Sequence, residues 1–312
     1  MKYLVTGGAG FIGSHIVDTL SERGNEIIIL DNFFSGRKEN ISHLKSIKKI
    51  HFIHGSITDL AMLKTTCESV DGIFHEAAIA SVARSVNNPV ATNETNVTGT
   101  LNVLMAARDA GVKKIVYASS SSVYGDTPTL PKTESMCPCP KSPYAVSKHA
   151  GEEYLRVFSE LYGLKTLSLR YFNVFGPRQD PQSDYAAVIP KFITRILARQ
   201  RPVIYGDGTQ TRDFTYVKDV AEANVKAMES SAEGVYNIAY GQQIDLNSLA
   251  DLIMSITGIM TTPIYEPPRP GDIHDSLADS SRARDMFGYN PRYTVKTGLQ
   301  ETIQWYQDRM RT

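Results

Sequence analysis

The sequence predicts an α/β fold: a doubly wound parallel sheet, with a smaller α/β lobe formed by the C-terminal part of the chain. Three observations predict it. Short apolar runs alternate with segments of helical periodicity through the first half of the chain. One of these runs, Glu26–Leu30, contains Ile-Ile-Ile-Leu, which is typical of a strand buried on both faces. After about Asn173 the alternation gives way to shorter elements separated by prolines.

The elements of the first half follow one another in a regular order. Strands are expected at Tyr3–Thr6, Glu26–Leu30, His51–Ile53, Gly72–His75, Lys114–Ser119 and Thr166–Arg170. The helices expected between them are Phe11–Arg23, Asn96–Ala110 and Pro143–Tyr162, and a glycine follows each one. Such alternation gives a parallel sheet with helices on both faces, and its ligands bind at the carboxyl ends of the strands.

The second half predicts a smaller lobe. Its expected helices are Val188–Arg199, Lys218–Ser230, Leu246–Thr257 and Thr297–Arg309. We therefore expect residues 1–173 to form the larger domain and residues 174–312 to form the smaller lobe. A segment near residues 216–239 is expected to return to the larger domain, so the boundary is not clean.

Composition excludes several classes of function. Lys plus Arg and Asp plus Glu each number 33, and this balance speaks against a nucleic-acid partner. No apolar run is long enough to span a membrane, and the chain opens on a strand, so we expect a cytoplasmic protein with no membrane partner. Cys137 and Cys139 have neither disulfide-framework nor redox-pair spacing. His51 and His54 lack a third ligand nearby, so no metal is expected.

A glycine-rich turn joins the first strand to the first helix. In Gly-x-x-Gly-x-x-Gly, Gly7 permits a tight turn, Gly10 lets the backbone approach a diphosphate, and Gly13 permits close packing of helix on strand. The amino end of the helix then attracts phosphate. Asp31, 18 residues after Gly13, ends the next strand, where a carboxylate binds ribose hydroxyls and repels a 2′-phosphate. The turn and this acid together predict NAD as the cofactor.

A tyrosine and a lysine four residues apart begin the helix predicted at Pro143–Tyr162. Tyr144 and Lys148 therefore share one helix face. A neighbouring ammonium and a nicotinamide cation would favour the phenolate and lower the pKa of the tyrosine, which could then accept a proton. An isolated Tyr-x-x-x-Lys is common on helix surfaces, but its place after a dinucleotide turn and the fifth strand favours catalysis. Ser119–Ser122 follow that strand and offer hydroxyls to a reacting group.

These motifs resemble the extended short-chain dehydrogenase/reductase family, whose fold is of the Rossmann type. The likeness rests on Thr6–Gly13, Val123–Gly125, Tyr144-x-x-x-Lys148, Tyr171–Asn173, Arg212–Asp213 and Arg269–Asp272, and it covers nearly the whole chain. Within the family the chain is most similar to NAD-dependent UDP-sugar 4-epimerases, especially those that act on UDP-N-acetylglucosamine. That closer likeness is carried by Tyr185–Lys191 and His274–Asp279.

The resemblance implies a role for each matching position. Tyr144 would be the base, Lys148 its electrostatic partner and Ser120 the catalytic hydroxyl. The implied NAD-binding residues are Gly7, Gly10, Phe11, Ile12, Asp31, Asn32, Ser56, Ile57, Ala77, Ala78, Asn96, Tyr144 and Lys148. The implied UDP-sugar-binding residues are Ser120, Asn173, Ala187, Val188, Tyr205, Arg212, Arg269, Asp272 and Ser276. Ser56 departs from the pattern, because many relatives place Asp there to contact the adenine amine.

The resemblance also favours one reaction over its neighbours. Dehydratases of the family carry an Asp-Glu pair in the positions of Ser121 and Ser122, and decarboxylases usually keep the Glu. A serine pair lacks the pKa for that acid–base work, so simple C4 epimerisation is expected. The alternatives are a UDP-glucuronate 4-epimerase or another nucleotide-sugar dehydratase or decarboxylase, and, more distantly, a non-catalytic NAD-binding regulator.

Two small side chains suggest which sugar is accepted. Ser276 stands where epimerases restricted to UDP-glucose often place a bulky Tyr, and Ala187 stands where some relatives have Asn. We therefore expect UDP-N-acetylglucosamine and UDP-N-acetylgalactosamine as substrates, with UDP-glucose and UDP-galactose also accepted. A homodimer formed through the helices Asn96–Ala110 and Pro143–Tyr162 is usual in the family, although packing within one chain explains their apolar faces nearly as well.

Overall fold

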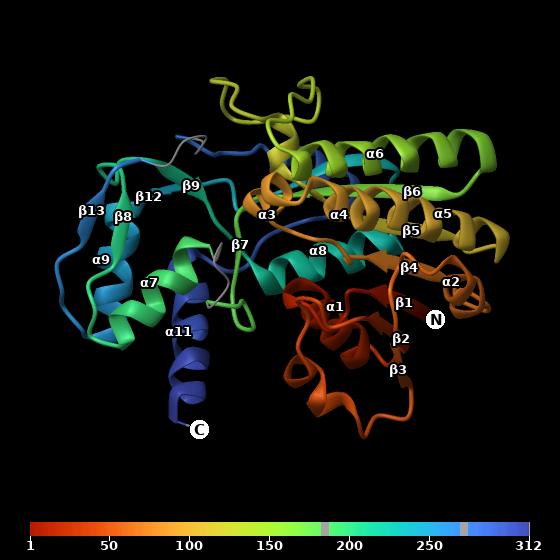
Figure 1. The fold of residues 1–312 in the computed structure, drawn as a ribbon, viewed down its shortest axis with the longest axis horizontal. Helices are drawn as coiled ribbons and strands as arrows, with labels where there is room; N and C mark the ends of the chain where they lie inside the picture. The colour runs from red at the N-terminus through yellow and green to blue at the C-terminus, as the bar shows by residue number, and fades with distance from the viewer. Residues whose placement is uncertain (182–186, 269–273, 312) are drawn as a thin grey trace.

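A computed structural model of the chain describes residues 1–181, 187–268 and 274–311. Its centre is a parallel sheet of seven strands in the order β11-β6-β5-β4-β1-β2-β3 (Figure 1). The strands are β1 (Lys2–Thr6), β2 (Glu26–Asp31), β3 (Ile50–His54), β4 (Gly72–His75), β5 (Lys114–Ser120), β6 (Lys165–Tyr171) and β11 (Gly234–Ile238). The doubly wound α/β fold predicted from the sequence is confirmed.

Helices cover both faces of this sheet. One face packs against α1 (Phe11–Glu22) and α8 (Val217–Glu229), which also touch each other. The other face packs against α2 (Leu60–Thr66), α5 (Gly99–Asp109) and α6 (Pro143–Tyr162). Burial on both faces explains the continuous apolar run of β2, because side chains that point to either side enter a core.

The helix that carries the Tyr-Lys pair has well-defined ends. The Ser142 hydroxyl caps its amino end by accepting a hydrogen bond from the Ala145 N–H, and Pro143 supplies the first-turn geometry. Gly163 ends the helix in a left-handed conformation, with a φ of 69°. These signals are all local in sequence, which is why the predicted bounds of α6 match the structure.

The helix expected to begin at Asn96 begins earlier in the structure. The chain forms α3 (Val82–Asn87), α4 (Pro89–Asn93) and the π-helical turn η3 (Glu94–Thr98) before α5 starts. The Asn88 side chain caps α4 and Pro89 occupies its first position. Valines do recur at helical spacing here, at Val82, Val86 and Val90, but all three are exposed and Pro89 interrupts the series, so no buried apolar face indicated a helix.

The smaller lobe lies beside the carboxyl ends of the central strands (Figure 1). Its core consists mainly of apolar side chains from three helices, α7 (Val188–Leu197), α9 (Leu246–Thr257) and α11 (Val295–Arg311). Two-stranded sheets flank them, formed by β8 (Val203–Tyr205) with β13 (Ile264–Glu266) and by β9 (Thr211–Asp213) with β12 (Gln243–Asp245). A third such sheet joins β7 (Val174–Phe175) to β10 (Thr215–Tyr216).

The chain crosses between the lobes more than once. After the chain returns from the smaller lobe, α8 packs on α1, and β11 pairs with β6 at the edge of the central sheet. A further helix, α10 (Ser281–Phe287), then packs on β11 through an edge-to-face contact between Phe287 and Tyr236. The division at residue 173 stays a prediction. Among the described residues, no helix has both the length and the apolar character needed to cross a bilayer.

Candidate active site

The glycine turn between β1 and α1 brings backbone against backbone. A Cβ atom on Gly13 would lie 2.3 Å from the carbonyl oxygen of Gly7, and a Cβ on Gly7 would lie 2.8 Å from the Ala77 nitrogen. Gly10 precedes α1 without a side-chain cap, so the first-turn N–H groups are left to a ligand or to water. This geometry leaves no room for side chains within the turn and suits a diphosphate at the helix end.

Asp31 lies beside the glycine turn, at the end of β2. Its side chain is buried, and its two carboxylate oxygens accept hydrogen bonds from the backbone N–H groups of Ala9 and Phe33, at 3.0 and 2.7 Å. Burial raises the pKa of this carboxyl, while the two N–H bonds oppose the shift. Each carboxylate oxygen can accept a further bond, so the group can bind a ribose diol while it holds the glycine turn to β2.

The predicted catalytic residues converge at the carboxyl end of β5. The Lys148 ammonium is buried and donates a hydrogen bond to the Ala118 carbonyl, 2.7 Å away. It lies 5.9 Å from the centre of the Tyr144 ring and 4.9 Å from that of Tyr117. Ser120, the last residue of β5, lies close enough to Tyr144 that hydrogen bonding between their side chains lowers the pKa of the tyrosine. The structure therefore brings together the tyrosine, lysine and serine that sequence reasoning selected.

Burial governs the protonation of this group in the chain alone. It raises the pKa of Tyr144 to about 12, a shift that the Ser120 hydrogen bond opposes and the Glu76 charge increases. Sequence reasoning expected a lowered pKa beside the ammonium and a nicotinamide cation, so for the chain alone the direction is the opposite one. Burial also lowers the pKa of Lys148 to about 8, and the charges of Glu76 and Glu152 act against that shift.

A buried ion pair supports α6 from behind. The Arg170 guanidinium on β6 donates to both oxygens of the Glu152 carboxylate, at 2.8 and 2.7 Å, and the Ser119 hydroxyl donates to the same carboxylate at 2.5 Å. Both charged side chains are almost completely buried. The pair fixes the rotation of α6 over β5 and β6, which sets where Tyr144 points. Its members lie 18 residues apart on two successive elements, so no short-range spacing pattern identified them.

Four further NAD-binding candidates follow strands of the central sheet. Ala77 and Ala78 follow β4 beside the glycine turn, while Ser56 and Ile57 follow β3, one strand beyond Asp31. Asn96 is different, because its buried amide binds the backbone of Ile79 and the Ser147 hydroxyl. Asn96 thus fixes the loop after β4 against α6, and its direct contact with NAD stays a prediction.

The substrate candidates lie mainly where β9 meets the segment around residue 276. The Asn173 amide donates to the Asp213 carbonyl at 3.0 Å and to the Ser276 hydroxyl at 3.1 Å. Arg212 donates to the His274 carbonyl, which anchors it beside the same segment. Ala187 and Val188 begin α7 and Tyr205 ends β8, farther along the lobe. Arg269 and Asp272 lie outside the described residues, as do Tyr185 and Ala186.

Comparison with known proteins decides the family. The model of the NAD dependent epimerase/dehydratase family matches residues 3–239. This chain belongs to that family. It is 42% identical to a putative UDP-glucose 4-epimerase of Methanocaldococcus jannaschii, over 99% of each chain. Of solved structures, it resembles a UDP-N-acetylglucosamine 4-epimerase from Methanobrevibacter ruminantium in complex with UDP-N-acetylmuramic acid, with a TM-score of 0.96, 44% identity and 99% of each chain covered. A UDP-glucose 4-epimerase of Thermus thermophilus in complex with NAD gives a TM-score of 0.90, 38% identity and coverage of 98% and 99%.

NAD is the cofactor of this epimerase/dehydratase, and the cleft fits it. The glycine turn has the open backbone that a diphosphate needs, since a Cβ at Gly13 would fill it. Asp31 ends β2, and Lys148 of α6 binds the Ala118 carbonyl near the end of β5, so both lie at the carboxyl edge of the sheet. Their contacts with the adenosine ribose and with the nicotinamide side stay predictions.

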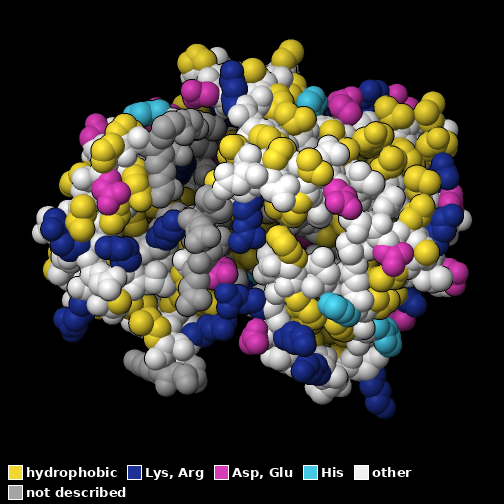
Figure 2. Space-filling view, viewed as in Figure 1, with side chains coloured by type: hydrophobic (Ala, Val, Ile, Leu, Met, Phe, Trp, Pro, Cys, Tyr) yellow, Lys and Arg dark blue, Asp and Glu magenta, His cyan; other side chains and the backbone are white. Residues whose placement is uncertain are grey.

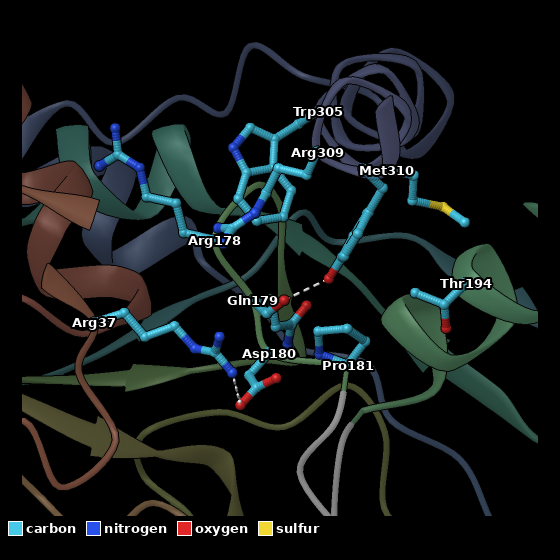
Figure 3. A pocket seen from close by; sticks show the side chains of 10 residues that line it. Arg37, Arg178, Gln179, Asp180, Pro181, Thr194, Trp305, Arg309 and Met310 are labelled. Carbon is cyan, nitrogen blue, oxygen red and sulfur yellow. Dashed lines mark hydrogen bonds and ion pairs between the residues drawn. The ribbon is translucent and has the colours of Figure 1, made fainter. Parts of the chain in front are cut away.

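A cavity lies at the seam between the lobes (Figure 3). It has a volume of about 360 Å³, and none of the predicted site residues that the structure describes lines it. Arg37 reaches across the seam to Asp180 at 2.7 Å, and Arg178 binds Asp18 at 2.6 Å. Lys and Arg side chains gather along this boundary on the molecular surface (Figure 2). Both arginines are therefore paired with acids of the chain itself, and these ion pairs join the two sides of the seam.

Proposed function

We propose that the NAD-dependent UDP-sugar 4-epimerase activity of this chain acts on UDP-N-acetylglucosamine and UDP-N-acetylgalactosamine, and that it also accepts UDP-glucose and UDP-galactose. The similar proteins named above include enzymes for both kinds of sugar. One observation carries the proposal most directly: Tyr144, Lys148 and Ser120 meet at the end of β5, one strand away from the loop that packs on the glycine turn.

The chemistry assigned to the chain is a proton transfer at the sugar C4 hydroxyl. NAD, when bound, supplies the hydride acceptor and a positively charged ring. The Tyr144 oxygen accepts the C4 hydroxyl proton, Ser120 hydrogen-bonds the reacting oxygen, and Lys148 stabilises the phenolate electrostatically. Because the free chain holds Tyr144 as a neutral phenol, the positive charges around it must act together to make it a base.

Epimerisation also requires that the 4-keto sugar presents its opposite face before it is reduced. Firm contacts at the diphosphate and loose contacts at the hexose permit that rotation. The proposed diphosphate contacts are Asn173 and Arg212, with Arg269 of the undescribed segment. Asp272 would bind the uridine ribose, and Tyr205 and Val188 would line the remainder of the site.

The turn after β5 supports epimerisation over dehydration. Ser121 and Ser122 follow Ser120 directly, so neither position offers a carboxyl group for elimination of water. The Ser122 hydroxyl is buried without a hydrogen-bond partner among the described residues, and it is available to a ligand. A neutral hydroxyl at this point can bind a sugar but cannot serve as the acid or base that the alternative reactions need.

Room for an N-acetyl group rests on two small side chains. Ser276 is partly buried, and its hydroxyl accepts a hydrogen bond from the Asn173 amide, which holds it on the side of the proposed diphosphate contact. Ala187 precedes α7 and is exposed. Neither side chain is large enough to close the space beside C2 of the hexose.

A panel of UDP-sugars tests this proposal. The purified enzyme is incubated separately with UDP-N-acetylglucosamine, UDP-glucose and UDP-glucuronate, without added reductant, and the products are identified by proton NMR. We expect the 4-epimers of the first two sugars and an unchanged UDP-glucuronate. Turnover of UDP-glucuronate alone would favour the alternative epimerase, and loss of water or carbon dioxide would favour a dehydratase or decarboxylase. A chain that converts none of them but binds NAD would be the regulator.

We also propose a homodimer and a cytoplasmic location. α6 keeps exposed apolar side chains at Val146, Leu161 and Tyr162, as an interface between two copies would require. Cys67, Cys137 and Cys139 are free thiols, which suits a reducing compartment. Light scattering after size-exclusion chromatography tests the assembly, and a mass of one chain contradicts it.

A further inference from the structure

A carboxylate that sequence reasoning did not select lies at the carboxyl end of β4, next to the strand that ends in Ser120. Glu76 follows β4 directly, and its backbone N–H continues the sheet by donating to the Thr6 carbonyl at 3.1 Å. One carboxylate oxygen accepts a hydrogen bond from the Tyr171 hydroxyl at 2.9 Å. That hydroxyl is held in place by the Asn224 amide, so the carboxylate has a fixed position. Glu76 is partly buried, and it follows His75, which pairs with Tyr117 of β5, so it lies across from Ala118, whose carbonyl binds the Lys148 ammonium.

The titratable and polar side chains around Glu76 come from five elements. Lys148 on α6 is the cation that acts on it, and Tyr144 on the same helix, Tyr117 on β5 and Tyr171 on β6 all feel its charge. His75, its neighbour on β4, stays neutral because burial lowers the pKa of the imidazole to about 3. Asn224 on α8 is uncharged at any pH.

The charges of two carboxylates, Glu76 and Glu152, act on Lys148, and they differ in whether a second cation also binds the carboxylate. Glu152 forms its buried pair with Arg170, so the negative charge that it presents to Lys148 is largely cancelled. The hydrogen-bond donor to Glu76 is the neutral Tyr171 hydroxyl. The net negative field at the catalytic pair therefore comes mainly from Glu76.

We propose that Glu76 is a positioning residue that sets the pH range in which the Tyr144–Lys148 pair works. The proposal rests on the proposed function, because it concerns the proton transfer assigned there to Tyr144. Glu76 need not touch the sugar for this role. Its charge acts through the two side chains that do the chemistry.

The direction of the effect is the same for both members of the pair. A negative charge raises the pKa of a phenol because it disfavours phenolate, and it raises the pKa of an ammonium group because it favours the cation. The charge of Glu76 acts in this way on Tyr144 and on Lys148. Its removal must therefore move both pKa values down over the pH range in which Glu76 is ionised in the wild type, which lies chiefly above pH 7.

The test is Glu76→Gln, which keeps an acceptor for the Tyr171 hydroxyl and removes only the charge. Because Glu76 is ionised chiefly above its pKa of about 7, the alkaline limb of the kcat/KM profile for 4-epimerisation should shift toward lower pH by at least about 0.5 unit, and a limb well below pH 7 should stay in place. Glu76→Asp, which restores the charge on a shorter side chain, should return the profile toward that of the wild type. Asn224→Ala disturbs the same cluster without changing charge, so it should lower activity without moving the limbs.

A second readout needs neither substrate nor turnover. Burial raises the pKa of Glu76 to about 7, so the folded protein binds protons that the unfolded chain has released, and its stability falls as pH rises toward and through that value. Glu76→Gln removes this dependence. The melting temperature of Glu76→Gln relative to the wild type should therefore increase between pH 5 and pH 8.

The outcomes separate this proposal from the proposed function. A Glu76→Gln profile with wild-type limbs, or an equal loss of activity at every pH, overturns the role of Glu76, as does a melting-temperature difference that is constant with pH. If the wild type epimerises no UDP-sugar, the proposed function fails. The stability comparison would then still decide whether a buried charge at Glu76 is present.

Discussion

The Lys148 ammonium donates a hydrogen bond to the Ala118 carbonyl at 2.7 Å, and this bond ties the first turns of α6 to the end of β5. Burial lowers the pKa of that ammonium to about 8, so keeping it charged opposes folding. Lys148→Met should reduce kcat by about 10²-fold or more and leave the melting temperature near that of the wild type or higher. Activity and stability that fall together would point to a structural role instead.

Tyr144→Phe removes the proposed proton acceptor and keeps the ring. The kcat for epimerisation should fall by about 10²- to 10⁴-fold, because that is the usual contribution of a positioned acid–base group. Tyr162→Phe is the matched control, since Tyr162 lies on the same helix and is 50% exposed. Its activity should equal that of the wild type. Near-normal turnover by Tyr144→Phe would remove the tyrosine from the chemistry.

Glu152→Gln breaks the buried pair with Arg170 and leaves a guanidinium unpaired. We expect a loss of about 3–5 kcal/mol in the free energy of unfolding, measured by urea denaturation at pH 7. Glu153→Gln is the control, because the Glu153 side chain is exposed and paired only with Arg156 at the surface. A control variant as unstable as Glu152→Gln would show that the pair is not the cause.

The same pair gives a pH dependence with a definite sign. Hydrogen bonds from Arg170, together with its charge, hold the pKa of the Glu152 carboxyl below its ordinary value, although burial opposes them. The contribution of ionised Glu152 to the free energy of unfolding is therefore complete above about pH 4.5, and it is lost as pH falls through the folded-state pKa of this carboxyl. The deficit of Glu152→Gln should shrink below pH 4.5, and a deficit that stays constant down to pH 3 would contradict this.

Ser276→Tyr tests the selectivity assigned to the substrate pocket. The added ring should fill the space proposed for the N-acetyl group and should also displace the Asn173 hydrogen bond. We expect kcat/KM for UDP-N-acetylglucosamine to fall by at least about tenfold relative to that for UDP-glucose, the scale of a steric mismatch in a pocket. Equal losses on both sugars would refute the gate.

Sequence reasoning succeeded where the signals were local. The cap, proline and glycine that bound α6 stand within a few residues of its ends, and the apolar run of β2 required burial on both faces. The glycine turn, Tyr144 and Lys148 are likewise defined by short spacing on neighbouring elements. These features predicted the fold class correctly, and they selected a tyrosine–lysine pair whose catalytic role stays a prediction.

What sequence reasoning missed depends on contacts between distant segments. Glu76 meets Tyr171 across 95 positions, and Glu152 meets Arg170 only because α6 crosses β6. Each acid taken alone has the pattern of a solvated loop or helix residue. The burial that raises the pKa of Tyr144 in the chain alone was not visible either, because the spacing of Tyr and Lys reveals a nearby charge but not the enclosure of the phenol. The lowered pKa expected with NAD bound stays a prediction.

Hydrogen tracing at C4 tests the central claim, that the sugar is oxidised and then reduced at one carbon while the hydrogen stays within the enzyme. UDP-N-acetylglucosamine carrying deuterium at C4 is converted by the wild type in ordinary water, and the product is examined by NMR and mass spectrometry. The account predicts UDP-N-acetylgalactosamine that retains deuterium at C4. A product carrying solvent hydrogen at C4 would contradict it.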